Sequence, residues 1–349
     1  MKTRATVAGI LMASCCIAAP TAWGGNHDFL KAGGVDDEAV ARAYYDTIDP
    51  GGLRTTQGDW EEVNGFNDPR NEVIDVRGYF NEGDLSFWRS IRMVTDQRPG
   101  YEGNIAFTTA NYASEAAALA GKPKASIVNM EYSPGPEDDR IAKFYVYEVD
   151  DVNNNGDRLT STVFDSTGEE LFVPAACYSC HGGDDDAEAP LPDGYNEGSG
   201  ETNATFLLLD VTTMAFGNTP LAGLETDFKK MNEAMLHTDP TKATRALIKG
   251  IYGGPGLPEN TQDLSYIPAS WAGEEELYRE VIIPSCRNCH TTSDTKLLSL
   301  SWWKANPAKI REVVFHEQTM PNSLPGFDRF WMSNQPGILG DALDRFELP

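Results

Sequence analysis

The sequence predicts an α+β protein, in which a mainly antiparallel β domain over residues 40–175 is followed by a mainly α region. Two observations support this fold class. Between residues 71 and 149, short runs of apolar and β-branched residues alternate with Gly- and Pro-rich turns, as antiparallel strands do. After residue 205, apolar residues recur at the three- and four-residue spacing of amphipathic helices. The 349 residues suffice for two or three domains.

Residues 1–24 have the composition of an export signal. Basic residues at positions 2 and 4 precede an apolar run over residues 5–19, which is too short to span a bilayer comfortably. Residues 11–15 resemble a bacterial lipobox, which would make Cys15 a lipid anchor, whereas cleavage near Ala22 or Gly24 would leave a soluble protein. We therefore predict a periplasmic or otherwise exported protein, attached to a membrane only if Cys15 is lipidated.

The β domain is predicted to contain five strands. The last of them alternates most clearly, with Lys143, Tyr145 and Tyr147 on one face and Phe144 and Val146 on the other. An alanine-rich stretch over residues 114–120 predicts one short helix. The G-x-x-x-x-G-K, G-x-S-x-G and H-E-x-x-H signatures of common nucleotide-binding proteins and hydrolases do not occur in the sequence. The predicted strands are residues 71–80, 84–94, 104–109, 125–132 and 140–149.

The segment Asp151–Asp157 allows two interpretations. Oxygen-bearing side chains stand at its positions 1, 3, 5 and 7, with Gly156 at position 6, as in a calcium-binding loop. Position 12, however, is Thr162, where such a loop has a bidentate glutamate. The Asn155-Gly156 dipeptide is also typical of hairpin turns. We predict a turn between two strands, and calcium binding is the alternative.

Two pentapeptides carry the chemistry of this chain: Cys177-Tyr178-Ser179-Cys180-His181 and Cys286-Arg287-Asn288-Cys289-His290. Both read C-x-x-C-H, the pattern for covalent attachment of a c-type haem. In a helical turn, residues i, i+3 and i+4 share one side, so both thiols can reach the porphyrin vinyl groups while the imidazole reaches the iron. Chance would give far fewer than one such pentapeptide in a chain with 6 Cys and 5 His. A zinc knuckle or a redox C-x-x-C pair would not require a histidine after each pair.

At these residues the chain resembles the dihaem c-type cytochromes. The resemblance implies two covalently bound haem c groups, held by Cys177 and Cys180 and by Cys286 and Cys289. It also implies that the haems are attached outside the cytoplasm, in agreement with the leader. We expect a first haem region over residues 176–265 and a cytochrome c-like haem domain over residues 270–349. The β domain matches no cytochrome family that we recognise.

Axial ligands can be proposed for both haems. His181 and His290 are the expected proximal ligands. Met320-Pro321, after a helix predicted over residues 307–317, resembles the distal Met loop of small c-type cytochromes, and His316 is its competitor. The first motif has no comparable Met-Pro pair. Its second ligand is expected to be His237, with Met130, Met214, Met235 or an open position as the alternatives. Further helices are predicted over residues 224–236, 241–252 and 274–283.

The charge of the chain limits its partners. The formal net charge is −25, so the phosphates of a nucleic acid would be repelled. The predicted loop 182–202 is rich in acidic, Gly and Pro residues and could serve as a docking collar for a basic redox partner, or simply be a solvated insert. The leading interpretation is an exported electron carrier. The alternative is a dihaem peroxidase-like or small-donor oxidoreductase, in which the first haem keeps an open or displaceable ligand position.

Overall fold

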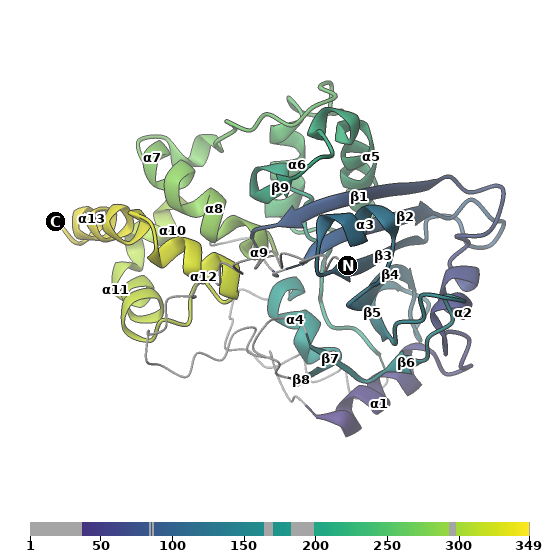
Figure 1. The fold of residues 1–349 in the computed structure, drawn as a ribbon. Coiled ribbons are helices and arrows are strands. Elements are labelled where there is room, and N and C mark those ends of the chain that lie inside the picture. Colours follow the sequence, from purple (N-terminus) through teal and green to yellow (C-terminus); the bar gives the residue numbers. More distant parts are fainter. Residues whose placement is uncertain are drawn as a thin grey trace, which may run out of the picture.

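The computed structural model describes residues 37–83, 85, 87–163, 170–182, 199–292 and 298–348. Within these residues the predicted α+β class is confirmed, because an antiparallel sheet occupies the N-terminal half and helices follow it (Figure 1). The leader with Cys15, and residues 183–198 of the acidic loop, lie outside the described residues. The proposals on export, lipidation and docking at this loop therefore stay predictions.

Seven strands form one antiparallel sheet in the order β6-β5-β4-β3-β2-β1-β9. Strands β1 to β6 follow the chain as a meander, and β9 returns later to pair with β1. The five predicted strands are present, but β2 begins four residues later than expected, because Leu85 and Phe87 pack against helix α4 (Ala175–His181) instead. The strands are β1 (Val73–Asn81), β2 (Trp88–Thr95), β3 (Ile105–Tyr112), β4 (Ser126–Pro134), β5 (Arg140–Tyr147), β6 (Arg158–Leu159) and β9 (Met214–Phe216), with a separate small sheet of β7 (Ser161–Val163) and β8 (Glu170–Phe172).

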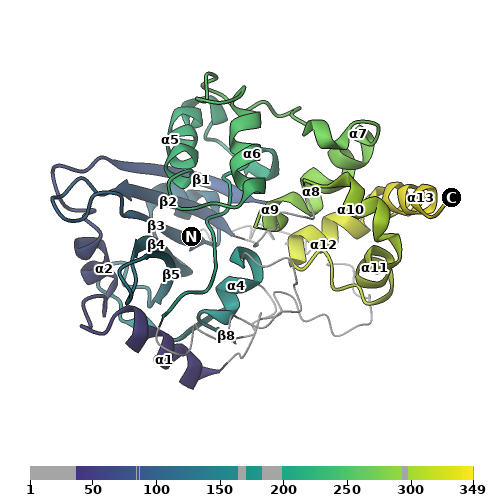
Figure 2. The ribbon, with the colours of Figure 1, turned by 180° about the vertical axis from the view of Figure 1, so that it is seen from behind.

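One face of the sheet is apolar, and later parts of the chain cover it. The register places Phe107, Met130 and Phe144 side by side on this face. Phe206, from the segment that follows the first motif, packs on Phe107 with ring centroids 5.3 Å apart. Helix α5 (Glu225–Met235) lies against β1 of the same sheet (Figures 1 and 2).

The opposite face buries a carboxylate, Glu131. Its Oε2 lies 3.0 Å from Arg54 Nε and 2.7 Å from Asn64 Nδ2, while its Oε1 accepts a hydrogen bond from Ser133 Oγ at 2.7 Å. Lys143 Nζ is 3.7 Å away. Burial alone would raise the pKa of Glu131, but the charges of Arg54 and Lys143 outweigh it and hold the pKa below its usual value. Glu131 is therefore ionised at neutral pH.

Two helices stand in the region expected to be mainly β. Helix α1 (Glu38–Ile48) begins at Asp37, whose carboxylate accepts a hydrogen bond from the Val40 N–H. Helix α2 (Gln57–Val63) begins with a capping box between Thr56 and Asp59. The predicted alanine-rich helix forms as α3 (Glu115–Ala120). The capping residues are the sequence signals from which α1 and α2 could have been predicted.

The helical region follows the predicted order with additions. The helices expected over residues 224–236 and 241–252 form as α5 and α6, whereas those over residues 274–283 and 307–317 each contain a π-helical turn. Helices α10, α12 and α13 were not predicted. The bounds are α6 (Lys242–Ile251), α7 (Glu275–Leu277), the π turn Tyr278–Ile282, α8 (Ile283–Ser285), α10 (Leu300–Ala305), α11 (Pro307–Arg311), the π turn Glu312–His316, α12 (Leu324–Trp331) and α13 (Gln335–Glu347).

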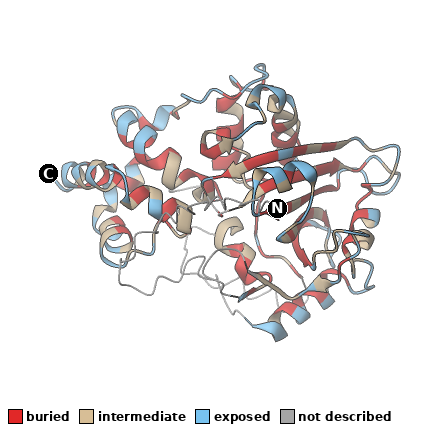
Figure 3. Cartoon of the chain, in the orientation of Figure 1, coloured by how far each residue is buried: buried red, intermediate tan, exposed pale blue. Residues whose placement is uncertain are grey.

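The apolar core runs without interruption from the sheet into the helices (Figure 3). It extends from Tyr44 in α1 through the apolar sheet face to Leu343 in α13. The division into a β domain, a first haem region and a cytochrome c-like domain stays a prediction. Among the described helices, none has the length and apolar character needed to cross a membrane.

The segment Asp151–Asp157 forms the predicted turn between β5 and β6. The Glu148 N–H donates to the Asp157 carbonyl at 2.8 Å, which closes the turn. Asn155 Oδ1 accepts from the Thr56 hydroxyl, and the Asp151 carboxylate lies 3.4 Å from Lys124 Nζ. These oxygens therefore have protein partners, and calcium binding stays a prediction.

The buried carboxylate leads to a prediction about stability. Glu131→Gln should lower the free energy of unfolding by roughly 3–5 kcal/mol at pH 7, because it leaves Lys143 buried without its paired carboxylate and Arg54 with Asp49 alone. Since the folded-state pKa of Glu131 is lowered, its stabilising contribution is present above the unfolded-state pKa of about 4.3 and is lost as the pH falls below that value. Urea unfolding followed by far-UV circular dichroism at pH 7 and pH 4 measures both effects.

The exposed pair of Glu72 and Lys230, 2.6 Å apart, provides the control. Glu72→Gln removes the same charge from the surface and should change the stability little. An equal loss of stability in both variants at pH 7 would contradict the role of burial.

Candidate functional site

The first C-x-x-C-H motif forms the end of helix α4 (Ala175–His181). The helix is closed by a hydrogen bond from the Gly182 N–H to the Tyr178 carbonyl at 2.8 Å. Helical spacing places the two thiols and the imidazole on one side of the turn, as the sequence predicts. These three side chains belong to Cys177, Cys180 and His181.

The imidazole of His181 is oriented by the next segment of the chain. Its Nδ1 lies 2.9 Å from the carbonyl oxygen of Thr205. A carbonyl can only accept, so Nδ1 carries the proton and Nε2 keeps its lone pair, which is the tautomer that a metal requires. The ring also contacts Phe144 on the apolar sheet face, with centroids 5.4 Å apart.

The second motif continues the helix formed by α7, the π turn and α8. The Cys286 N–H donates to Ile282 at 3.1 Å, and the His290 N–H donates to Cys286 at 3.1 Å. The residues from Arg287 to His290 form α9. The second motif therefore also presents Cys286, Cys289 and His290 from one helical turn.

A buried ion pair holds the second motif in place. Arg287 is 1% exposed and Asp210 is 2% exposed. Arg287 Nε lies 2.8 Å from Asp210 Oδ2, and Nη2 lies 2.5 Å from the same oxygen. The Thr212 hydroxyl accepts from Arg287 at 2.8 Å and donates to Asp210 Oδ1 at 2.6 Å. The guanidinium therefore has partners on two residues of one segment.

The two motif helices are neighbours. Helices α4 and α9 approach within 8 Å between Cα atoms, and both lie between the sheet and the C-terminal helices (Figures 1 and 2). The segment 205–213 contacts both: Thr205 accepts from His181, and Asp210 pairs with Arg287. Two motifs that are 109 positions apart in the sequence thus belong to one site, which sequence reasoning did not predict.

The loop between β1 and β2 also reaches both motifs. Leu85 and Phe87 pack in a small apolar cluster with Cys177 and Cys180. Gly83 lies so close to the second motif that an added Cβ would come within 3.1 Å of the Asn288 Cβ. Sequence reasoning assigned Leu85 and Phe87 to a strand, because apolar residues in such a run look the same whether they leave the sheet or stay in it.

The motif thiols are better suited to covalent attachment of a haem than to acting as thiolate anions. Burial raises the pKa of Cys177 and of Cys286 to about 12, so both are neutral thiols at physiological pH. None of the four motif cysteines forms a disulfide. Among the described residues, no three or more His, Cys, Asp or Glu side chains converge as metal ligands. Each motif thus offers two thiols and one imidazole, the set that a covalent haem c uses.

Met320 lies in the loop between α11 with its π turn and α12. Its side chain is half-buried against the core, and its N–H donates to Val313 at 3.3 Å. Three residues later, Ser323 Oγ contacts the Gly83 carbonyl at 3.4 Å, beside the second motif. The loop therefore runs near the second motif. His316 is exposed and pairs with Glu312 at 2.8 Å, as a surface residue would.

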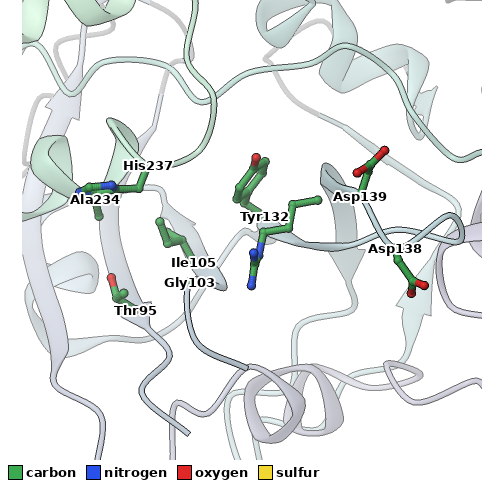
Figure 4. Close-up of a pocket in the computed structure, with 9 residues that line it drawn as sticks. Thr95, Gly103, Ile105, Tyr132, Asp138, Asp139, Ala234 and His237 are labelled. Atoms are coloured by element: carbon green, nitrogen blue, oxygen red, sulfur yellow. The ribbon is translucent and has the colours of Figure 1, made fainter. Parts of the chain in front are cut away.

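His237 lies two residues beyond the end of α5. It is exposed and lines a pocket of about 500 Å³ between the end of α5 and the sheet (Figure 4). His181 is not among the lining residues. Met130, Met214 and Met235 are buried, and Met130 pairs directly across the strands with Phe144, the residue that contacts His181. The other lining residues are Thr95, Gly103, Ile105, Tyr132, Asp138, Asp139, Arg140 and Ala234.

Comparison of the chain with models of protein families, with curated proteins and with solved structures finds no match. No family can therefore be assigned from similarity along the chain. The two motifs and the geometry around them are what supports a function.

Proposed function

We propose that the protein is an exported dihaem c-type cytochrome that transfers electrons between redox partners. One observation carries this proposal: two C-x-x-C-H turns lie on neighbouring helices, and the Thr205 carbonyl orients the imidazole of the first through Nδ1. Haem supplies the redox chemistry when it is bound. A pair of neighbouring haem motifs favours passage of electrons through the chain rather than storage at one centre.

The residues of the chain would have distinct roles. Cys177, Cys180, Cys286 and Cys289 would form the thioether bonds. His181 and His290 would be the proximal ligands, and the Thr205 carbonyl would keep His181 in its ligating tautomer. Met320 would be the distal ligand at the second haem, because its loop runs beside the second motif.

The acidic character of the chain favours a basic redox partner. A charge of −25 creates a negative field that would attract such a protein and increase its association rate at low ionic strength. The same field disfavours nucleic acid as a partner. The leader supports a periplasmic or otherwise exported location.

One observation supports the alternative that the protein is an enzyme. His237, the predicted second ligand of the first haem, is exposed and lines a pocket that does not include His181. If no other side chain occupies the second axial position, the first haem would have an open or displaceable site. The protein would then be a peroxidase-like enzyme or an oxidoreductase of a small donor.

Haem content tests the proposal directly. The protein secreted from a host with a c-type haem attachment system should carry two haems per chain in a pyridine haemochrome assay and stain for haem on a denaturing gel. Cys177→Ala with Cys180→Ala should leave one covalent haem, at the second motif. A chain without covalent haem after export would overturn the proposal.

Substitution of Met320 tests the ligand at the second haem. Met320→Ala should abolish the near-infrared sulfur-to-iron band and lower the potential of one haem, because the thioether stabilises the reduced iron. The matched control is Met332→Ala, since Met332 is 62% exposed and lies only twelve residues away. Loss of the band in the control, or its persistence in Met320→Ala, would assign the ligand elsewhere.

Substitutions at Met130 and His237 separate the carrier from the enzyme. A carrier is expected to keep the first haem six-coordinate and low-spin. Met130 is buried beside the residue that contacts His181, so Met130→Leu should convert this haem to high-spin and let carbon monoxide bind the reduced form. His237→Ala should then leave the optical and EPR spectra unchanged, and the reverse result would assign His237 as the ligand. Rapid carbon monoxide binding by the unmodified protein would favour the enzyme.

A further inference from the structure

The second motif contains a charge that the attachment chemistry does not need. Cys286, Cys289 and His290 perform the attachment and ligation, whereas Arg287 occupies a position that the C-x-x-C-H pattern leaves open. Its guanidinium is nevertheless among the most deeply buried side chains of the protein. Removing such a charge from water is costly, and its attraction to one carboxylate seldom exceeds that cost. A packed apolar residue would stabilise the fold as well or better, so stability alone does not explain Arg287.

The partners of Arg287 fix where its charge lies. Asp210 accepts a hydrogen bond from Nε of the guanidinium and forms an ion pair with Nη2, and Thr212 bridges the two charged groups through its hydroxyl. On the other side, the guanidinium carbon lies 5.9 Å from the centre of the Tyr278 ring. Burial would lower the pKa of Arg287, but Asp210 raises it above its usual value, so the cation persists. The positive charge is therefore permanent and rigidly held.

The two charges of the pair belong to different parts of the site. Arg287 directly follows the attachment residue Cys286, whereas Asp210 belongs to the segment that also accepts the hydrogen bond of His181. In a buried environment, a fixed charge is screened weakly and acts on any group near it that changes charge. Reduction adds one electron to an iron centre, so a nearby cation favours the reduced form and a nearby carboxylate favours the oxidised form.

We propose that the buried pair of Arg287 and Asp210 sets the reduction potential of the haem attached at Cys286 and Cys289. Arg287 raises this potential, and Asp210 limits the increase. The inference rests on the proposed function, because it requires that the second motif carries haem. Neither residue ligates the iron. Asp210 acts through its hold on Arg287 and through its own charge, so it is a positioning residue.

The experiment uses the full-length haem-loaded protein and four variants: Arg287→Gln, Asp210→Asn, the combined Arg287→Gln/Asp210→Asn, and Arg287→Lys. Potentials are measured by optical titration with dithionite and ferricyanide in the presence of mediators, where each haem gains or loses one electron. The second haem is identified as the signal that remains in a Cys177→Ala/Cys180→Ala chain. Haem content and urea unfolding are measured in parallel.

The expected shifts have opposite signs. Arg287→Gln should lower the reduction potential of the second haem by about 59 mV. For one electron, this shift equals about a tenfold decrease in the ratio of reduced to oxidised protein. Asp210→Asn should raise it by a similar factor. The combined variant loses both charges and keeps two amides that can hydrogen-bond, so its potential should return to within about threefold of the original. Arg287→Lys keeps the charge and should shift the potential less than Arg287→Gln.

Asp96→Asn is the matched control. Asp96 is 1% exposed and pairs with Arg98 at 2.6 Å. It directly follows the last residue of β2, whereas the β1–β2 loop and the motifs lie at the other end of this strand. Asp96→Asn should destabilise the protein without changing the reduction potential of either haem. A shift of the same sign in Arg287→Gln and Asp210→Asn, or an equal shift in the control, would overturn the inference.

The outcomes also separate this inference from the proposed function. Asp210→Asn leaves Arg287 buried without a counter-charge and could fail to fold. In that case, the combined variant and Arg287→Gln still show the sign of the shift in the reduction potential of the second haem. If both motifs bind haem and the potentials do not respond, the pair is only structural and the cytochrome proposal stands. If the unmodified exported protein binds no haem, the proposed function fails first.

Discussion

The arrangement of the site depends on the contacts of the segment 205–213. This segment packs on the apolar face of the sheet and gives one acceptor to each motif: the Thr205 carbonyl to His181 and the Asp210 carboxylate to Arg287. These acceptors are only five positions apart in the sequence, so an extended chain cannot place them more than about 18 Å apart. The relative positions of the two motif helices follow from this short connection. Because the ion pair is buried, solvent screens it weakly.

The ends of the second motif helix are secured by a further set of contacts. The Thr291 carbonyl, at the end of α9, accepts hydrogen bonds from Thr241 Oγ1 at 2.5 Å and Thr244 Oγ1 at 3.0 Å, in the first turn of α6. At the other end, Arg329 of α12 donates to the Pro284 carbonyl at 2.6 Å. A four-residue helix has too few internal hydrogen bonds to be stable alone, so these contacts define its orientation.

Local patterns in the sequence predicted the structural features that depend on residues close together in the chain. The alternation from Ile141 to Tyr147 predicted a strand, which forms as β5, although both of its faces are buried. The C-x-x-C-H spacing likewise predicted one helical turn at each motif. The burial of Arg287 could not be predicted, because its partner Asp210 is 77 positions away and an arginine between two cysteines is usually exposed. The contact between His181 and Thr205 also depends on how the chain folds back, which no short pattern encodes.

The sheet contributes residues that contact the first motif. Phe144 of β5 contacts the imidazole of His181, and Leu85 of the β1–β2 loop packs beside Cys177 and Cys180. Because the apolar core is continuous from these residues into the helical region, removing the sheet would expose the first motif to water on one side. A site enclosed in this way has a lower effective dielectric constant, in which charges such as Arg287 and Asp210 act more strongly on their surroundings.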